Sequence, residues 1–381
     1  MNQKCKLLFV YICALIIRMI YKRYFPPKIL NDFLKNHNDR LDYNILGHSV
    51  NNLPIYELNI GTGKKRILMW SQMHGNESTT TKALLDFIPW LLDSNQKNLL
   101  NTFTFYIIPQ LNPDGAEAYT RLNANQFDLN RDAIELSQPE SLLLRNAYDR
   151  ITPDYALNLH GQRTIYSAGL NGGPATLSFL APSADLDRSI TSARKTAMSA
   201  IGGIYMALCK ELPDGIGRYD DTFNPNCVGD TFTRKGTPTI LFEAGHYPGD
   251  YQREMCRKFV FKALKALINY LENDNEVYSI EQYLKIPKNT DDYVDLIVSN
   301  IDISVDGKIL KNQQLAIQYI EELKDGEVIF TPSFHDFGSQ LSQKAHRYIN
   351  LPFDDLSDSI HYFKDKIIKN SKFDKLFSVN H

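Results

Sequence analysis

Residues 66–77 read RILMWSQMHGNE and contain the pattern that decides the fold. The run Ile67–Gln72 has the length of a buried strand, and the polar turn Met73-His74-Gly75-Asn76-Glu77 follows it directly. A helical pattern over Thr80–Leu92 comes next. A buried strand, a polar turn and then a helix are typical of a βα unit in a parallel sheet. The stretch therefore predicts an α/β fold with polar side chains at a strand end.

The same alternation continues along the chain as far as Leu271. Three further strands are expected at Phe103–Gln110, Tyr155–Leu159 and Thr239–Ala244. Further helices are expected at Pro139–Asp149, Arg188–Leu208 and Tyr251–Leu271. Strands that alternate with helices of this length predict a mostly parallel sheet. We expect residues 41–273 to form this domain.

The sequence changes character after a polar, acidic break at residues 272–276. Short strand-like runs follow, with the turn signals Asp306-Gly307 and Asp325-Gly326 between and after them. The expected strands are Tyr293–Val298, Ile301–Val305 and Val328–Thr331. We therefore expect residues 277–381 to form a small β-rich accessory domain.

The N-terminal segment, residues 1–40, carries an apolar run at residues 7–17 after Lys4 and Lys6. This layout is that of a signal peptide, but an A-x-A-like cleavage site is missing, and the run is too short to span a bilayer. A buried or amphipathic helix, an export or membrane-associating segment, and an extension without a role all stay open. Five cysteines without a CxxC pair favour a reducing, cytoplasmic compartment and argue against a disulfide framework.

Composition excludes several classes of protein. Hydrophobic residues make up 43% and charged residues 23% of the 381 residues, as in soluble globular proteins, so wholesale disorder is excluded. The 42 basic and 44 acidic residues give a net charge of −2, which argues against a nucleic-acid partner. A small or neutral substrate is favoured.

Chemically useful residues collect where the expected strands end. His74 and Glu77 follow the first strand, His160 follows the strand at Tyr155–Leu159, and Glu243 lies near the end of Thr239–Ala244. Singly, each is also explained as a polar residue at a turn or a helix start. Because ligands bind at the carboxyl ends of parallel strands, the residues together predict a site at one sheet edge. Two histidines and a glutamate would leave the fourth position of a catalytic zinc ion open.

The ordered set of motifs resembles the zinc carboxypeptidases of the M14 metallopeptidase family over residues 45–272. The motifs are His74-Gly75-Asn76-Glu77, Asn112-Pro113-Asp114-Gly115, Arg121, Asp128-Leu129-Asn130-Arg131, His160 and Glu243. The resemblance implies a three-layer α/β/α fold with a mixed, mostly parallel sheet. It also implies one zinc ion per chain and hydrolysis of a peptide bond beside a free C-terminal carboxylate.

The resemblance also assigns roles to individual residues. His74, Glu77 and His160 correspond to the zinc ligands, and Glu243 to the general base that activates the zinc-bound water. Arg121 corresponds to the arginine that polarises the scissile carbonyl. Asn130 and Arg131 correspond to the pair that holds the substrate's terminal carboxylate, and the guanidinium of Arg131 is expected to be buried. Asp128 corresponds to the carboxylate that orients His74.

Two residues near the expected site are less clearly placed. Tyr219 lies upstream of Glu243 at about the distance of the family's mobile tyrosine, or is an ordinary loop tyrosine. His246 follows Glu243 by three residues, and we expect it either to support a metal ligand or to have a structural role, because three ligands already satisfy a one-zinc site.

The chain also departs from the family pattern. Only 83 residues separate Glu77 from His160, and Gly161-Gln162-Arg163 replaces the Ser-Tyr pair of pancreatic-type members. The loops that shape the substrate cleft are therefore expected to be trimmed. Two alternatives stay open: an amidohydrolase on N-acyl amino acids, similar to aspartoacylase and succinylglutamate desuccinylase, and a non-catalytic carboxylate-binding protein.

Overall fold

The computed structural model describes residues 22–273, 280–305, 308–351, 360–363, 366–367 and 379. Its main element is an eight-stranded mixed sheet with the strand order β1-β2-β4-β3-β5-β9-β7-β8. The strands are β1 (Asp42–His48), β2 (Pro54–Ile60), β3 (Lys65–Ser71), β4 (Phe103–Ile108), β5 (Tyr155–Gly161), β7 (Leu177–Leu180), β8 (Ile216–Arg218) and β9 (Thr239–Ala244). The central strands β4, β3, β5 and β9 run parallel, whereas β1, β2 and the β7–β9 pair introduce antiparallel neighbours.

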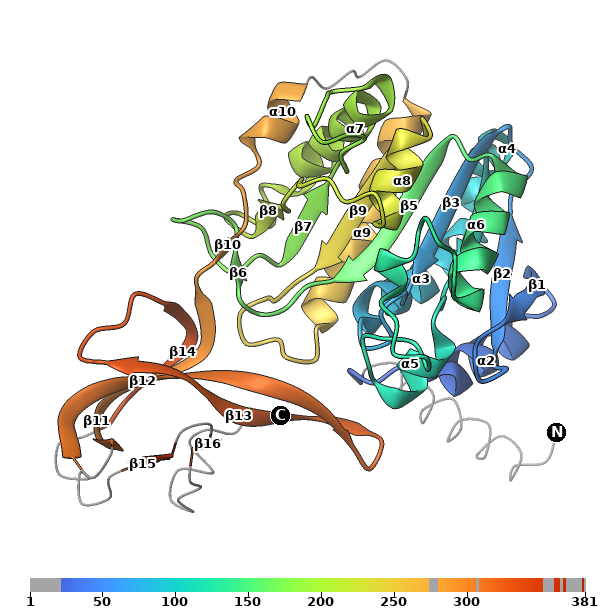
Figure 1. The fold of residues 1–381 in the computed structure, drawn as a ribbon. Helices are drawn as coiled ribbons and strands as arrows, with labels where there is room; N and C mark the ends of the chain where they lie inside the picture. The colour runs from blue at the N-terminus through green and yellow to red at the C-terminus, as the bar shows by residue number, and fades with distance from the viewer. Residues whose placement is uncertain are drawn as a thin grey trace, which may run out of the picture.

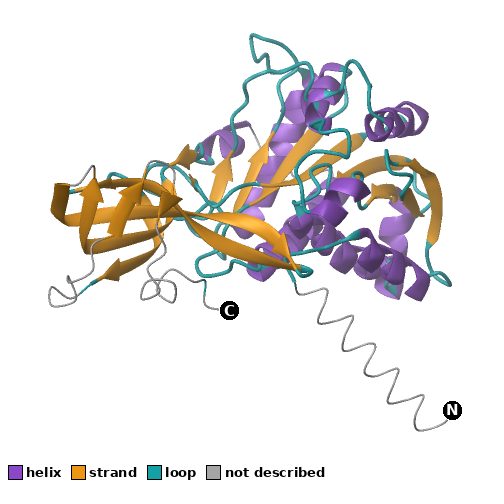
Figure 2. Ribbon diagram, turned by 60° about the horizontal axis from the view of Figure 1, so that its bottom comes forward, coloured by secondary structure: helices purple, strands orange, loops and turns teal. Residues whose placement is uncertain are grey.

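Helices cover both faces of this sheet. The helical elements are α2 (Pro27–Asn36), α3 (Ser78–Leu91), α4 (Lys97–Thr102), α5 (Pro113–Ala118), α6 (Pro139–Ile151), α7 (Ser192–Leu208), α8 (Val228–Arg234), α9 (Glu254–Glu272) and α10 (Ile280–Lys285), with short 3-10 turns η1 (Ser94–Gln96) and η2 (Leu129–Arg131). One apolar core lies under α2, α3, α7, α9 and α10, and a second core contains residues of α6 and α8. The expected α/β/α arrangement with a mostly parallel sheet is confirmed (Figure 2).

The four strands expected from apolar runs are β3, β4, β5 and β9; β9 has the expected bounds, and the ends of the other three differ by at most two residues. The strands β1, β2, β7 and β8 were not expected. β1 shows why, because most of its side chains are exposed or half-buried and no apolar run marks it. Two helices begin later than expected. α7 begins at Ser192, where Thr191 caps it by accepting from the Arg194 N–H, and α9 begins at Glu254 after Arg253, whose φ is 63°.

The C-terminal part is a second sheet with the order β13-β12-β11-β15-β16, to which β14 adds on β11. Its strands are β11 (Tyr293–Val305), β12 (Lys308–Lys324), β13 (Glu327–Gly338), β14 (Lys344–Asn350), β15 (Ile360–Phe363) and β16 (Lys366–Ile367), and a small β6 (Tyr166–Ser167) pairs with β10 (Thr290–Asp291) between the two parts. The expected β-rich character is confirmed.

Individual strands of this sheet differ from the expectation. The two short strands expected at 293–298 and 301–305 are one strand, β11, with irregular register beside β12. β12 itself was not expected, because polar residues occupy much of it. The Asp325-Gly326 turn joins β12 to β13 with both φ values positive, as a tight hairpin requires. Residues 306–307 lie outside the described residues.

The helices α2 and α10, which precede and follow the expected catalytic domain, pack in the core of the main sheet. Ile29, Leu30 and Phe33 of α2 belong to the same core as α3, and so does Tyr283 of α10. The expected boundaries at 40 and 277 therefore fall within one packed unit. The apolar run at residues 7–17 lies outside the described residues. None of the helices in the described part has the length and apolar character needed to cross a membrane.

The β12–β13 hairpin runs along the edge of the main sheet at which β5 and β9 end (Figure 1). Its turn approaches the N-terminal part of the described chain, where Lys22 pairs with Glu327. The site edge of the sheet therefore faces the accessory sheet.

Candidate metal centre

The turn between β3 and α3 carries two of the expected ligands, His74 and Glu77. It packs tightly against the first turn of α5, and a Cβ atom on Gly75 would lie 1.9 Å from the backbone of Gly115. Glycine is therefore required at position 75, because any side chain would push the two turns apart. Asn112 stabilises the neighbouring turn by accepting from the Gly115 N–H at 2.9 Å.

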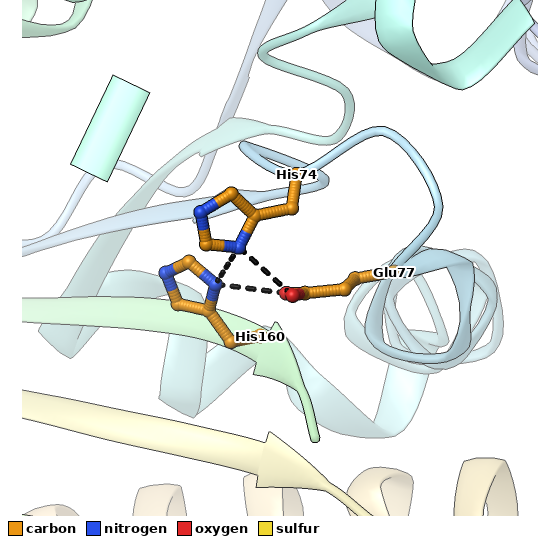
Figure 3. Close-up of side chains that lie close together, drawn as sticks. All are labelled: His74, Glu77 and His160. Atoms are coloured by element: carbon orange, nitrogen blue, oxygen red, sulfur yellow. Dashed lines mark hydrogen bonds and ion pairs between the residues drawn. The ribbon is translucent and has the colours of Figure 1, made fainter. Parts of the chain in front are cut away.

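His74, Glu77 and His160 meet in space (Figure 3). Nδ1 of His74 lies 2.8 Å from Oε1 of Glu77, and Nδ1 of His160 lies 2.9 Å from Oε2 of the same carboxylate. The two Nδ1 atoms lie 3.1 Å apart. Two imidazole nitrogens and a carboxylate turned toward one point are the donors that a catalytic zinc ion uses. These residues fit zinc.

Burial and neighbouring charges shift the pKa values of His74, Glu77 and His160. Burial lowers the pKa of His74, but Glu77 and Asp128 outweigh burial and raise it to about 9. Burial raises the pKa of Glu77, yet the two histidines hold it well below its usual range. Burial lowers the pKa of His160. The carboxylate thus stays ionised, and a bound cation would displace the proton that His74 otherwise holds.

Asp128 contacts the far side of the His74 ring. The Nε2 atom of His74 donates to Oδ1 of Asp128 at 3.0 Å, which leaves Nδ1 facing Glu77 and His160. Arg121 donates to Oδ2 of Asp128 from Nε at 3.2 Å and from Nη2 at 3.0 Å, and its Nη1 lies 3.4 Å from Glu77. A carboxylate behind a ligating histidine fixes the ring orientation. Both expected neighbours of the centre therefore lie beside it.

Glu243 lies on β9 next to His160 on β5, and the two are register partners. Its side chain is only 8% exposed, and Oε2 has no hydrogen-bond partner among the described residues. Burial, together with the charge of Glu77, raises its pKa well above the usual range. A buried carboxylate without a fixed partner, at the edge of a cleft, is suited to accepting a proton.

Asn130 and Arg131 lie in the 3-10 turn η2 at the opposite side of the cleft. Oδ1 of Asn130 accepts from the Val228 N–H at 3.0 Å, and Arg131 Nη1 donates to the Asn130 carbonyl at 2.7 Å. The expected burial of the Arg131 guanidinium is wrong, since the side chain is exposed. Leu129 takes the buried position of this turn, which leaves Arg131 at the cleft surface.

Tyr219 also lies in the cleft, directly after β8. Its hydroxyl is 3.2 Å from that of Tyr166, and burial and the charge of Glu243 raise its pKa. The described cysteines Cys209, Cys227 and Cys256 are free.

Comparisons with known proteins agree with this geometry. Residues 28–163 match the family model described as zinc carboxypeptidase, Peptidase_M14. This part of the chain is similar to zinc carboxypeptidases. The chain is 29% identical over 201 residues to carboxypeptidase M of Mus musculus, covering 44% of each chain. It is 31% identical over 114 residues to carboxypeptidase 2 of Trichophyton tonsurans, covering 29% of this chain and 20% of that protein.

Solved structures share the fold of the main sheet and its helices. A metallo-carboxypeptidase from Burkholderia cenocepacia superposes with a TM-score of 0.54 at 19% identity, covering 67% of this chain and 71% of the other. Bovine thrombin-activatable fibrinolysis inhibitor, solved in complex with tick carboxypeptidase inhibitor, also gives 0.54, at 17% identity, covering 67% of this chain and 99% of that chain. The matches to curated relatives span less than half of each relative's length.

The cleft beside the three side chains has a volume of about 930 Å³ and includes residues that sequence reasoning missed. Cys227 accepts from Arg131 Nη1 at 3.0 Å, and Asp230, whose pKa burial raises to about 6, lines the same wall. Residues from β12 and β13 line the other wall. These residues were missed because an apolar run in the sequence can predict a strand but cannot show which distant segment lines a cleft.

His246 is separate from the metal centre. It is buried against His346 of β14, with ring centroids 4.1 Å apart, and both of its ring nitrogens lack a hydrogen-bond partner within the described chain. Its ring also packs edge-on against Tyr251. This packing at the joint between the two sheets agrees with the structural role expected for it.

Proposed function

We propose that this chain is a zinc carboxypeptidase that hydrolyses the last peptide bond of a substrate with a free C-terminal carboxylate. The observation that carries the proposal is the meeting in one cleft of three possible metal donors, the Asn130-Arg131 turn and a buried Glu243 whose Oε2 has no hydrogen-bond partner among the described residues. The fold and the family match support the same chemistry. His74, Glu77 and His160 would hold one zinc ion.

When bound, zinc polarises the scissile carbonyl and lowers the pKa of the attacking water. Glu243 accepts a proton from that water and returns it to the leaving amine, a role that fits its raised pKa. Asp128 holds the His74 ring by its Nε2–H. Arg121 places a guanidinium where negative charge develops on the carbonyl oxygen.

Binding of the substrate carboxylate is assigned to Asn130 and Arg131. A guanidinium fork can donate two parallel hydrogen bonds to a carboxylate. The exposed Arg131 has room to do so, because only Nη1 is engaged by Asn130 and Cys227 in the contacts described. The side chain of Tyr219 lies in the same cleft and would cover the bound residue.

The test compares hydrolysis of one peptide with a free or an amidated C-terminus, with the N-acyl derivative of its last amino acid as a third substrate. We expect zinc-dependent cleavage of the free peptide, little cleavage of the amide, and loss of activity after chelation that added zinc restores. Preference for the N-acyl amino acid would identify an amidohydrolase instead. Zinc binding with no hydrolysis of any of the three would support the non-catalytic alternative.

A further inference from the structure

The accessory sheet forms part of the cleft that contains the metal centre. Residues of β12 and β13 line the same cleft as His160 and Glu243. These residues are Gln318, Tyr319, Ile320, Glu321 and Phe330. Ile320 is 52% exposed although it is a large apolar side chain. An exposed apolar side chain on a cleft wall is a candidate contact for a ligand.

Glu321 ties the hairpin to the catalytic part through charge. Arg23 Nη2 donates to both oxygens of Glu321, at 2.9 and 3.1 Å, and the Tyr119 hydroxyl donates to the same carboxylate. Arg23 is 6% exposed and also donates to Thr79, which lies two residues beyond the ligand Glu77. Because both charges are largely removed from water, losing one partner is costly.

A second set of contacts joins Tyr319 and Phe330 of the hairpin to Tyr251 and Asp295. Asp295 of β11 accepts from the Tyr251 hydroxyl at 3.0 Å and from the Tyr319 N–H at 2.7 Å. The Gln318 amide donates to Thr164 at 2.8 Å. The ring of Tyr251 meets those of Tyr319 and Phe330 edge-on, with centroids 5.5 and 5.3 Å apart. The hairpin is thus seated on loops that follow β5 and β9.

Two groups of residues that line the cleft lie on opposite faces of the main sheet. Asn130 and Arg131 contact the start of α8, on the face that holds the core of α6 and α8. Arg23 contacts the first turn of α3, on the face that holds α3 and α9. If the substrate carboxylate lies at Arg131 and the scissile bond at the metal centre, the rest of the substrate extends toward the hairpin residues that line the same cleft.

We propose that the β12–β13 hairpin closes the end of the cleft that receives the residues before the cleaved bond, so that the enzyme takes short peptides with an apolar residue at that position. The inference rests on the proposed carboxypeptidase function and adds its substrate class. Tyr319, Ile320 and Phe330 supply the apolar surface, and the Arg23–Glu321 pair holds that surface in place.

The experiment measures kcat/KM for peptides that share their last two residues and grow at the N-terminus from a dipeptide to a decapeptide. The full-length protein is used as wild type, Glu321→Gln and Ile320→Ala. Glu322→Gln is the matched control, because Glu322 is the next residue on β12 and its described contact is with Thr331 of β13 rather than with the catalytic part. A second series varies the residue before the cleaved bond between leucine, serine and glutamate in a tripeptide.

For wild type we expect kcat/KM to be about tenfold or more higher for the tripeptide than for the decapeptide, and highest with leucine before the cleaved bond. Glu321→Gln should narrow the length difference, Ile320→Ala should narrow the preference for leucine, and Glu322→Gln should change neither. Equal rates for short and long peptides in wild type, or unchanged profiles in both variants, would overturn the proposal. If no free-carboxylate peptide of any length is cleaved, the proposed function itself is wrong and this inference falls with it.

Discussion

His160 and Glu243 are paired residues on neighbouring parallel strands, β5 and β9. Side chains at paired positions of adjacent strands lie on the same side of a sheet, so this register sets a metal ligand beside the carboxylate that faces the cleft. Both strands are buried at the centre of the fold. The spacing of the proposed ligand His160 and the proposed base Glu243 is therefore set by the main-chain hydrogen bonds of the sheet rather than by loops.

Replacing Glu243 by glutamine separates metal binding from chemistry. The amide keeps the shape of the side chain but cannot accept the proton, so turnover should fall by roughly 10²–10⁴-fold. Zinc content should stay at about one ion per chain, because the three donors are unchanged. Metal analysis and kcat on one peptide measure the two effects. Glu272→Gln, at an exposed position at the end of α9, is the control. Near-normal turnover in Glu243→Gln would place the base elsewhere.

The Asp128→Asn variant tests the support of His74. Without the carboxylate, the His74 ring loses its charged partner and Arg121 loses the acceptor of two hydrogen bonds. Zinc affinity should fall by roughly 10–100-fold. Competition with a chromophoric chelator measures this. Asp220→Asn is the matched control, since Asp220 lines the same cleft and is exposed. Equal affinity in both variants and wild type would remove Asp128 from the centre.

Truncation of Arg131 to alanine should affect substrates with a free carboxylate. The discriminating charge is lost, so kcat/KM should fall for the free peptide and change little for the amide, which narrows the gap between them. Lysine should restore only part of the preference, because its point charge lacks the planar fork. Arg163→Ala, at another exposed arginine of the cleft, serves as control. A gap that is as wide in Arg131→Ala as in wild type would contradict the assignment.

The joint between the two sheets should loosen in acid. Burial lowers the pKa of His346 from 6.5 to about 4, although its Nε2–H donates to the Thr164 carbonyl at 2.7 Å. Its ring packs on His246 and Tyr293, and the charge of Arg253 also disfavours its protonation. Between pH 6.5 and 4 the unfolded chain binds this proton more tightly than the folded chain, so stability is complete above that window and falls as pH decreases through it.

The loss due to His346 amounts to roughly 3 kcal/mol at most. His346→Gln should therefore reduce the difference in the free energy of unfolding between pH 7 and pH 4. Urea titrations at several pH values measure this difference. His335→Gln on β13 is the control, because His335 is exposed on the same sheet. An identical pH dependence in His346→Gln and wild type would show that the joint does not resist protonation.

The sequence predicted those strands in which a buried apolar run ends in a residue that can bind metal or transfer a proton. Thr239–Ala244 is apolar up to Glu243, so both the strand and its functional end were visible. β12 was not predicted because lysine, glutamate and glutamine alternate with its apolar residues. A strand with one solvent-exposed face and charged ends does not form a long apolar run in the sequence. The exposure of Arg131 was also missed, since a motif assigns a residue type to a role without fixing its depth. No sequence pattern predicts the contact of Glu321 with Arg23, because the two residues lie far apart in the sequence and meet only in the folded chain.

The Arg23–Glu321 pair spans 298 residues of the chain and has a consequence for the order in which the protein matures. During synthesis Arg23 leaves the ribosome long before Glu321 exists, so its guanidinium must remain in water until almost all of the described chain has been made. The main sheet can assemble earlier from its own strands. The wall of the cleft cannot, because its anchor Glu321 follows every strand of the main sheet in the sequence. A nascent chain that ends before β12 therefore lacks this wall of the cleft, and the proposed selectivity for substrates would arise only once β12 and β13 have been made.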